Sequence, residues 1–232
     1  MSMPAQLVST KILSPELVEQ LKQSGISIAC HNFIQTIIRI PNQATVSRCH
    51  QYIVLTSKNA VRAWLAIAEK YSIPLADHLI FCTDKATRQE AVKHQLSVIG
   101  TAPNAESLAG VIARTSQVKA VTFICSNQRR DELPMLLKAG GIIVHEINCY
   151  HTELTPLKIN DPYDSVLFFS PSGVDSFLSL NKIAPVCFCI GATTAAHASE
   201  RGFSEIQIAE AATPESMIKK VIHYYKKDTV HA

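Results

Sequence analysis

Short turns rich in serine and threonine follow four apolar runs of this sequence and carry its clearest candidates for binding chemistry. The turns span residues 57–59, 84–87, 170–173 and 191–194. Each offers hydroxyl groups and, where a helix should follow, unpaired backbone N–H groups, but no strong nucleophile. Such N–H groups at a helix start favour an anion. The turns therefore predict binding of a negatively charged small molecule, while the simpler interpretation, that these residues only cap helices, stays open.

The sequence lacks the motifs of several common enzyme classes. It has no GxGxxG and no GxxxxGK[ST], so dinucleotide and nucleoside-triphosphate binding lose their main support. It has no GxSxG elbow, and its nine histidines form neither HxH nor HExxH. Hydroxyls, amides and a few cations suit a polyanionic substrate whose reaction needs positioning more than acid–base force.

The turns belong to an internal repeat with an offset of about half the chain. The matched segments are residues 52–65 with 165–178, 80–87 with 187–194, 105–108 with 214–217, and 8–11 with 124–127. Two related halves of this kind predict two lobes, and a cleft between two lobes is a favoured place for a ligand.

Apolar runs that alternate with segments of helical periodicity must position these turns. The runs lie at residues 5–10, 26–30, 52–55, 79–82, 121–125, 165–169 and 186–190. This alternation predicts parallel sheets covered on both faces, with ligands bound outside the carboxyl ends of the strands. Ser14-Pro15-Glu16 predicts a helix start, and Gly25 predicts the end of that helix. Two extended segments, residues 33–40 and 146–155, occupy equivalent places in the repeat and are expected to pair as a hinge.

Composition indicates a globular protein. The chain has 232 residues, 47% of them hydrophobic, and no apolar run long enough for a membrane helix. It lacks a signal peptide, so we expect a cytoplasmic protein without a membrane partner. A net charge of +3 is too small for a nucleic-acid binder but compatible with an anionic ligand.

The sequence has seven cysteines and no CxxC spacing, which predicts free thiols that pack as small apolar side chains.

Five short motifs resemble those of the uroporphyrinogen-III synthase family, in that family's order. They lie at residues 55–61, 130–134, 150–152, 168–174 and 190–195. The resemblance runs nearly end to end. It implies two flavodoxin-like parallel-sheet lobes joined by a two-stranded β-ladder, the first lobe being built from both chain ends. On this basis lobe one comprises residues 1–33 and 156–232, lobe two residues 42–145, and the linker strands residues 34–41 and 146–155.

The resemblance also implies a reaction of tetrapyrrole (haem) biosynthesis. Members of the family cyclise hydroxymethylbilane, a linear tetrapyrrole with acetate and propionate arms. The substrate loses its hydroxyl as water and becomes an azafulvene. The last ring is then inverted through a spiro intermediate, and the macrocycle closes to uroporphyrinogen III. No metal or cofactor takes part, and a monomer suffices for one continuous cleft.

Site residues follow from matching this sequence to the family. Tyr150 is the expected catalytic residue and would hydrogen-bond the departing hydroxyl, unless it only packs the hinge. The expected substrate-binding residues are Thr87, Thr194, Ser57, Ser172, Lys11, Lys58, Thr193 and Gly173. Ser170, Arg62, Lys85, Arg129 and Arg130 are further candidates near loop mouths.

The chain departs from the family at a few positions. Asp84 and Ser126 stand where the family often has glycine, and Lys11 follows Thr10 where arginine is common. Asp84 tolerates a left-handed turn but places a negative charge beside a proposed carboxylate site. An inactive relative of the synthases therefore stays open as an alternative. A two-lobed protein that binds a small anion without chemistry stays open as well, because such proteins also close around a hinge.

Overall fold

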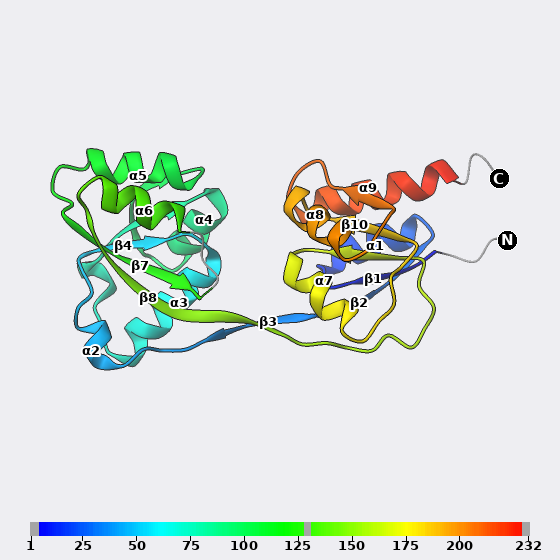
Figure 1. The fold of residues 1–232 in the computed structure, drawn as a ribbon, viewed down its shortest axis with the longest axis horizontal. Coiled ribbons are helices and arrows are strands. Elements are labelled where there is room, and N and C mark those ends of the chain that lie inside the picture. Colours follow the sequence, from blue (N-terminus) through cyan, green and yellow to red (C-terminus); the bar gives the residue numbers. More distant parts are fainter. Residues whose placement is uncertain (1–4, 128–130, 229–232) are drawn as a thin grey trace. The chain divides into compact units, whose positions relative to one another are not determined.

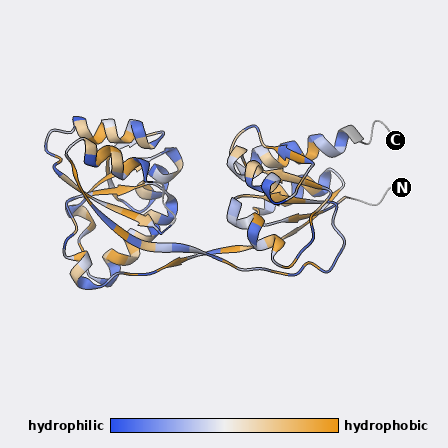
Figure 2. Ribbon diagram, in the orientation of Figure 1, coloured by the Kyte–Doolittle hydropathy of each residue, from blue (hydrophilic) through white to orange (hydrophobic). Residues whose placement is uncertain are grey.

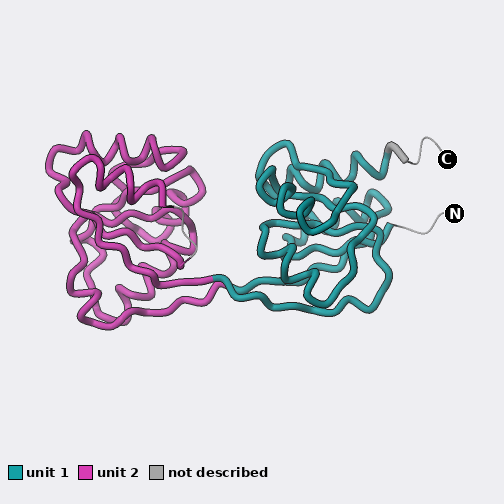
Figure 3. Tube along the Cα trace, in the orientation of Figure 1, with its two compact units in different colours: residues 1–35, 152–232 teal, residues 36–151 magenta. Residues whose placement is uncertain are grey.

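The chain forms two compact units (Figure 3). The computed structural model describes residues 5–127 and 131–228, with side chains up to residue 226. Unit 1 combines the residues up to Gln35 with those from Thr152 onward, and unit 2 is Thr36–His151. One unit therefore draws on both ends of the chain, as the sequence predicts. The finer bounds expected for the lobes and linker strands stay predictions.

Unit 2 holds a six-stranded sheet in the order β3-β8-β7-β4-β5-β6. Its strands are β3 Ile34–Ile38, β4 Tyr52–Leu55, β5 Leu79–Thr83, β6 Ser97–Ala102, β7 Ala120–Ser126 and β8 Ile143–Leu154. The helices are α2 Gln43–Val46, α3 Lys58–Lys70, the 3₁₀ turn Leu75–Asp77, α4 Lys85–Lys93, α5 Ala105–Arg114 and α6 Glu132–Ala139. The strands from β4 to β8 are parallel. That β3 and β8 form a ladder joining the lobes stays a prediction.

Alternation along the strands explains why helices cover both faces of this sheet (Figure 1). In β4, Ile53 and Leu55 pack in one cluster with Trp64 of α3, whereas Val54 packs in another with Leu108 of α5 and Leu133 of α6. Figure 2 shows the sheet strands as largely hydrophobic. All seven cysteines are free, as predicted.

Unit 1 holds a five-stranded parallel sheet in the order β11-β10-β9-β1-β2. Its strands are β1 Ala5–Ser9, β2 Ile26–Cys30, β9 Ser165–Phe168, β10 Val186–Cys189 and β11 Ile206–Ile208. Its helices are α1 Pro15–Gln23, α7 Pro171–Leu178, α8 Ala192–Glu200 and α9 Pro214–Asp228. Counted along the chain this is the flavodoxin-like order 2-1-3-4-5. Helices α7 and α8 pack on one face, and α1 and α9 on the other.

The two sheets have the same plan, which supports the repeat seen in the sequence. Replacing β9, β10, β11, β1 and β2 by β4, β5, β6, β7 and β8 turns the order of the five-stranded sheet into that of the six-stranded sheet, which has β3 as one additional strand at its edge. Equivalent glycines follow α1 and α6 with nearly equal positive φ, +74° at Gly25 and +76° at Gly141. Glycine adopts this conformation without a steric penalty. The loops after β4 and β9, and those after β5 and β10, are therefore equivalent pairs.

No helix among the described residues is both long and apolar enough to cross a membrane.

Candidate active site

Tyr150 lies in β8, where the pairing with β7 is irregular. Cys125 pairs with Asn148 but Ser126 pairs with Tyr150, so β8 accommodates one extra residue, Cys149. The tyrosine hydroxyl lies 3.0 Å from the Ser57 hydroxyl. Ser57 is the N-cap of α3 and accepts the N–H of Ala60 at 3.1 Å. The structure therefore brings together two of the predicted site residues.

Burial raises the pKa of Tyr150, an effect that the Ser57 hydrogen bond partly offsets. Desolvation disfavours the phenolate and keeps the side chain neutral near pH 7. A neutral phenol donates one proton and accepts a hydrogen bond at the same time. Tyr150 can therefore donate a hydrogen bond to a ligand while it accepts one from Ser57.

A cavity of about 390 Å³ lies at the carboxyl ends of the unit 2 strands, with Tyr150 in its wall. Its lining also includes Thr56, Thr83, Asp84, Asn104, Phe123, Cys125, Ser126, Glu132 and Leu133. The cavity thus combines apolar surface and hydroxyl groups with two carboxyl groups. Its position at the strand ends is the usual one for ligands in sheets of this class.

Thr87 lies at the start of α4, but it is not the helix cap. Asp84 is the N-cap, and its carboxylate accepts the Thr87 N–H at 2.7 Å and the Thr87 hydroxyl at 3.3 Å. Thr87 is only 1% exposed. Both of its donors are therefore occupied by Asp84, and the capping role considered for Thr87 is wrong.

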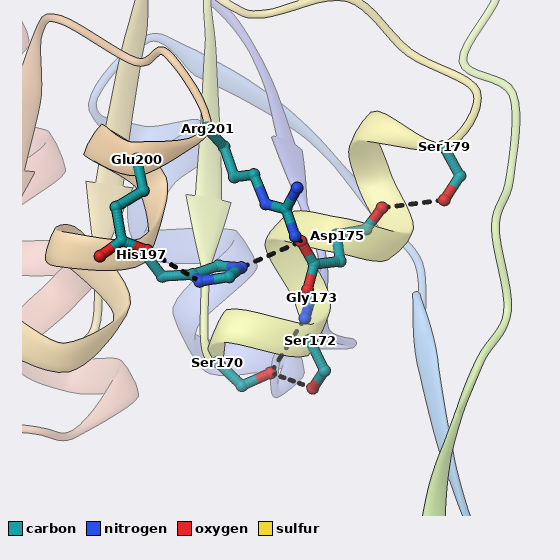
Figure 4. A network of polar contacts seen from close by, with 8 residues as sticks. All are labelled: Ser170, Ser172, Gly173, Asp175, Ser179, His197, Glu200 and Arg201. Atoms are coloured by element: carbon teal, nitrogen blue, oxygen red, sulfur yellow. Dashed lines mark hydrogen bonds and ion pairs between the residues drawn. The ribbon is translucent and has the colours of Figure 1, made fainter.

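The loop between β9 and α7 places hydroxyl groups against the end of β1. Ser170 caps α7 by accepting the Gly173 N–H at 3.2 Å, and its hydroxyl lies 3.1 Å from that of Ser172 (Figure 4). A Cβ atom at Gly173 would lie 3.3 Å from Thr10 Oγ1, so glycine permits this close approach. The Thr10 hydroxyl donates to Leu167 O at 2.8 Å.

The equivalent loop between β10 and α8 is open. Gly191 is the N-cap of α8, and no side chain caps this helix. Thr193 is exposed, whereas Thr194 is 3% exposed. The N-cap residue of α8 therefore offers no side-chain acceptor to the amide groups at this helix start, unlike Asp84 at the start of α4.

An ionic network joins α7 to α8 and was not visible in the sequence (Figure 4). Asp175 Oδ1 lies 2.9 Å from His197 Nε2 and 2.8 Å from Arg201 Nη2. The network fixes the two helices whose starts carry Ser172 and Thr194. No sequence signal could have found it, because Asp175 meets its partners only through tertiary packing.

The remaining candidate residues belong neither to the cavity beside Tyr150 nor to the loops at the starts of α7 and α8. Lys58 is exposed at the first position of α3, and exposed Lys11 has its Nζ 5.7 Å from the ring centre of Phe169. Arg62 pairs with Glu90 at 3.6 Å. Arg129 and Arg130 lie outside the described residues. Within the described parts of the chain, no group of three or more histidine, cysteine or acidic side chains is arranged to hold a metal ion.

Comparisons with known proteins agree with this fold. The family model described as uroporphyrinogen-III synthase HemD matches residues 15–219. No curated protein matches the chain. The solved uroporphyrinogen-III synthetase of Helicobacter pylori is 18% identical, with 95% of this chain and 99% of that chain covered and a TM-score of 0.72. A mutant uroporphyrinogen III synthase of the extremely thermophilic bacterium Thermus thermophilus is 13% identical, with 96% and 99% covered and a TM-score of 0.62.

The two solved structures show the fold, and the family model, which spans most of the sequence, shows the relationship. The chain therefore belongs to the uroporphyrinogen-III synthase family.

Proposed function

We propose that Tyr150 carries the dehydration step of the synthase reaction in this chain. The family consists of cyclising hydro-lyases that convert hydroxymethylbilane to uroporphyrinogen III, and the chain has that function by membership. Its assignment to particular residues is our proposal. The observation that supports it most is the neutral Tyr150 hydroxyl, held 3.0 Å from Ser57 in the wall of the unit 2 cavity.

The first step needs a proton on the leaving oxygen. Tyr150 donates its phenolic proton as the C–O bond of the hydroxymethyl group breaks and the pyrrole nitrogen supplies an electron pair, giving water and a protonated azafulvene that carries the positive charge. The last ring then attacks the methylene carbon to form the spiro intermediate. The bond from that ring to its old methylene bridge breaks, and a new bond to the bridge forms at the free α-carbon of the ring, which inverts it. The last ring loses the proton of that carbon when aromaticity returns, and this proton restores Tyr150. The net change is loss of one water.

The acid arms of the substrate need several anion-binding groups. Ser172, Thr193 and Thr194 lie at or near two helix starts of unit 1, where hydroxyl and backbone N–H groups can bind carboxylates. Gly173 lies in the same turn and leaves space beside these groups, although its own N–H is donated to Ser170, and Lys11 and Lys58 supply exposed positive charge. Positioning by these groups would provide much of the rate enhancement, since cyclisation requires a folded substrate.

A product-isomer assay tests this function. Freshly made hydroxymethylbilane is supplied to the purified protein, and the products are oxidised and separated as type I and type III uroporphyrins. The linear substrate closes by itself to type I, so type III above the no-enzyme control establishes both cyclisation and ring inversion. Only type I from folded protein would leave the anion-binding protein or the inactive relative.

Cytoplasmic localisation, a monomeric state and independence of nucleic acid stay predictions from the sequence. Cell fractionation and sedimentation would test the first two.

A further inference from the structure

The two equivalent loops before α4 and α8 differ at their cap residue. Residues 83–87 match residues 190–194 in the repeat, and each loop leads from a parallel strand into a nine-residue helix. The cap is Asp84 in unit 2 and Gly191 in unit 1. One repeated position is thus occupied by an acid in one unit and left without a side chain in the other.

Asp84 fills the start of its own helix. Its backbone has φ +50° and ψ 162°, a conformation that side chains rarely adopt. In this conformation the carboxylate accepts the Thr87 N–H at 2.7 Å and the Thr87 hydroxyl at 3.3 Å. An anion that belongs to the protein therefore already binds the donors that a substrate carboxylate would need.

Gly191 leaves the corresponding place open. Its φ of −178° is ordinary extended backbone, and a Cβ atom added there would meet no atom within 4 Å. Thr194 is 3% exposed, and its hydroxyl has no hydrogen-bond partner among the described residues. Thr87, its counterpart, shows that a hydroxyl at this position can bond a carboxylate at the helix cap.

We propose that Asp84 is a specificity-determining residue, which occupies the start of α4 in place of a substrate carboxylate so that the start of α8 binds an acid arm instead. This inference rests on the proposed function. It assigns the acid arm to unit 1.

The unit 2 cavity supports the same assignment. Asp84 and Glu132 both contribute to its lining, and two carboxyl groups repel an acid arm. Phe123 and Leu133 supply apolar surface beside them. The cavity is therefore better suited to the uncharged pyrrole part of the substrate, whose N–H groups are hydrogen-bond donors.

Reciprocal substitutions at the two caps test the proposal, with KM for type III formation as the readout. Gly191→Asp gives α8 a cap like that of α4 and should raise KM about tenfold or more, because a charge-assisted bond to the substrate is lost. Gly191→Ala adds a methyl group but no acceptor, so its effect should stay below about threefold. Asp84→Gly opens α4 and should lower KM about threefold. Asp84→Asn, which keeps a cap without the charge, should fall between Asp84→Gly and the wild type.

Direct binding separates this inference from the proposed function. Uroporphyrin III, a stable carboxylate-rich product analogue, can be titrated by its fluorescence without turnover. Weaker binding by Gly191→Asp than by Gly191→Ala supports the inference even if the wild-type protein makes no type III product. The inference is overturned if these two variants bind alike, or if Asp84→Gly raises KM or lowers kcat more than tenfold while remaining folded.

Discussion

The Tyr150 hydroxyl is the group on which the proposed chemistry depends most. It is neutral, partly buried and bonded to Ser57, so the structure provides both a proton and a means of orienting it. The same hydrogen bond also satisfies the hydroxyl within the protein, which is what a purely structural tyrosine would need. Kinetics of single variants distinguish the two roles.

Tyr150→Phe should lower kcat about 100-fold, because the leaving hydroxyl loses its proton donor. The free energy of unfolding should fall by no more than about 1 kcal/mol, the value of one hydrogen bond. Ser57→Ala is the matched control: it removes the partner but keeps the phenol, so kcat should fall less than about tenfold. Its loss of the α3 cap should cost about 0.5–2 kcal/mol of stability. Full activity of Tyr150→Phe would exclude the tyrosine from the mechanism.

The ionisation of Tyr150 predicts a loss of stability in alkali. Its pKa is raised from 10.0 by burial, so the folded protein holds the proton more tightly than the unfolded chain. Below about pH 10 both states are protonated and this group contributes no pH dependence. Above that pH the unfolded chain ionises first, and stability falls as the pH rises toward the folded pKa. Denaturant melts of the wild type should therefore lose more stability above pH 10 than melts of Tyr150→Phe, and equal slopes would contradict the assignment.

At the scale of elements, the packing of β6 against β5 depends on a glycine. A Cβ atom at Gly100 would lie 2.6 Å from Cδ1 of Phe81, a ring that is 1% exposed and packed against α5. The register between β5 and β6 also shifts next to Phe81. The strand and the ring therefore share space that only glycine leaves free.

Gly100→Ala should destabilise unit 2 by about 1–3 kcal/mol through overpacking. Gly110→Ala, within α5, is the opposite case: the nearest atoms to its added Cβ belong to the Arg114 side chain at 3.7 Å or more. The free energy of unfolding of that variant should rise by about 0.5–1 kcal/mol, because alanine has a higher helix propensity than glycine. Thermal or urea unfolding of the two variants should give changes of opposite sign. An equal change in the stability of both variants would show that contact with Phe81 does not destabilise Gly100→Ala.

The elements themselves were largely predictable from the sequence. The helix after Ser14 begins at Pro15 and Gly25 has the positive φ expected of a helix end, although Ser14 makes no side-chain cap bond. The short helix α2 was not expected, since four residues carry no periodicity. The extended segment expected at residues 146–155 proved to be part of a longer strand, β8, which begins at Ile143 and pairs with β7 on both sides of Glu146.

At the scale of the whole molecule, each unit has its own core. The two apolar clusters of unit 2 and the two of unit 1 share no residue. Unit 2 is also continuous in sequence, whereas unit 1 needs both ends of the chain. This division predicts that unit 2 can fold without unit 1.

A fragment of residues 34–154, which contains every strand of the unit 2 sheet, should unfold in one cooperative transition. It should form no type III product, because the helix starts proposed to bind the acid arms, those of α7 and α8, belong to unit 1. Circular dichroism during heating and the product-isomer assay measure the two properties, with the full chain as reference. A fragment without a cooperative transition would mean that unit 2 depends on unit 1 for stability.

The alternation of strands and helices, the repeat, the equivalence of the loops and the position of Tyr150 in an extended segment could all be predicted from sequence patterns. These features depend on local periodicity and residue type, which act over a few residues. The structure added that Asp84 has a positive φ and that its carboxylate binds Thr87, a local contact that occupies the start of α4, whereas the start of α8 has no side-chain cap. The contact of Asp175 with His197 and that of Tyr150 with Ser57 depend on tertiary packing alone. Such bonds join residues far apart in the chain, and their distances follow from how strands and helices pack, which no local pattern specifies.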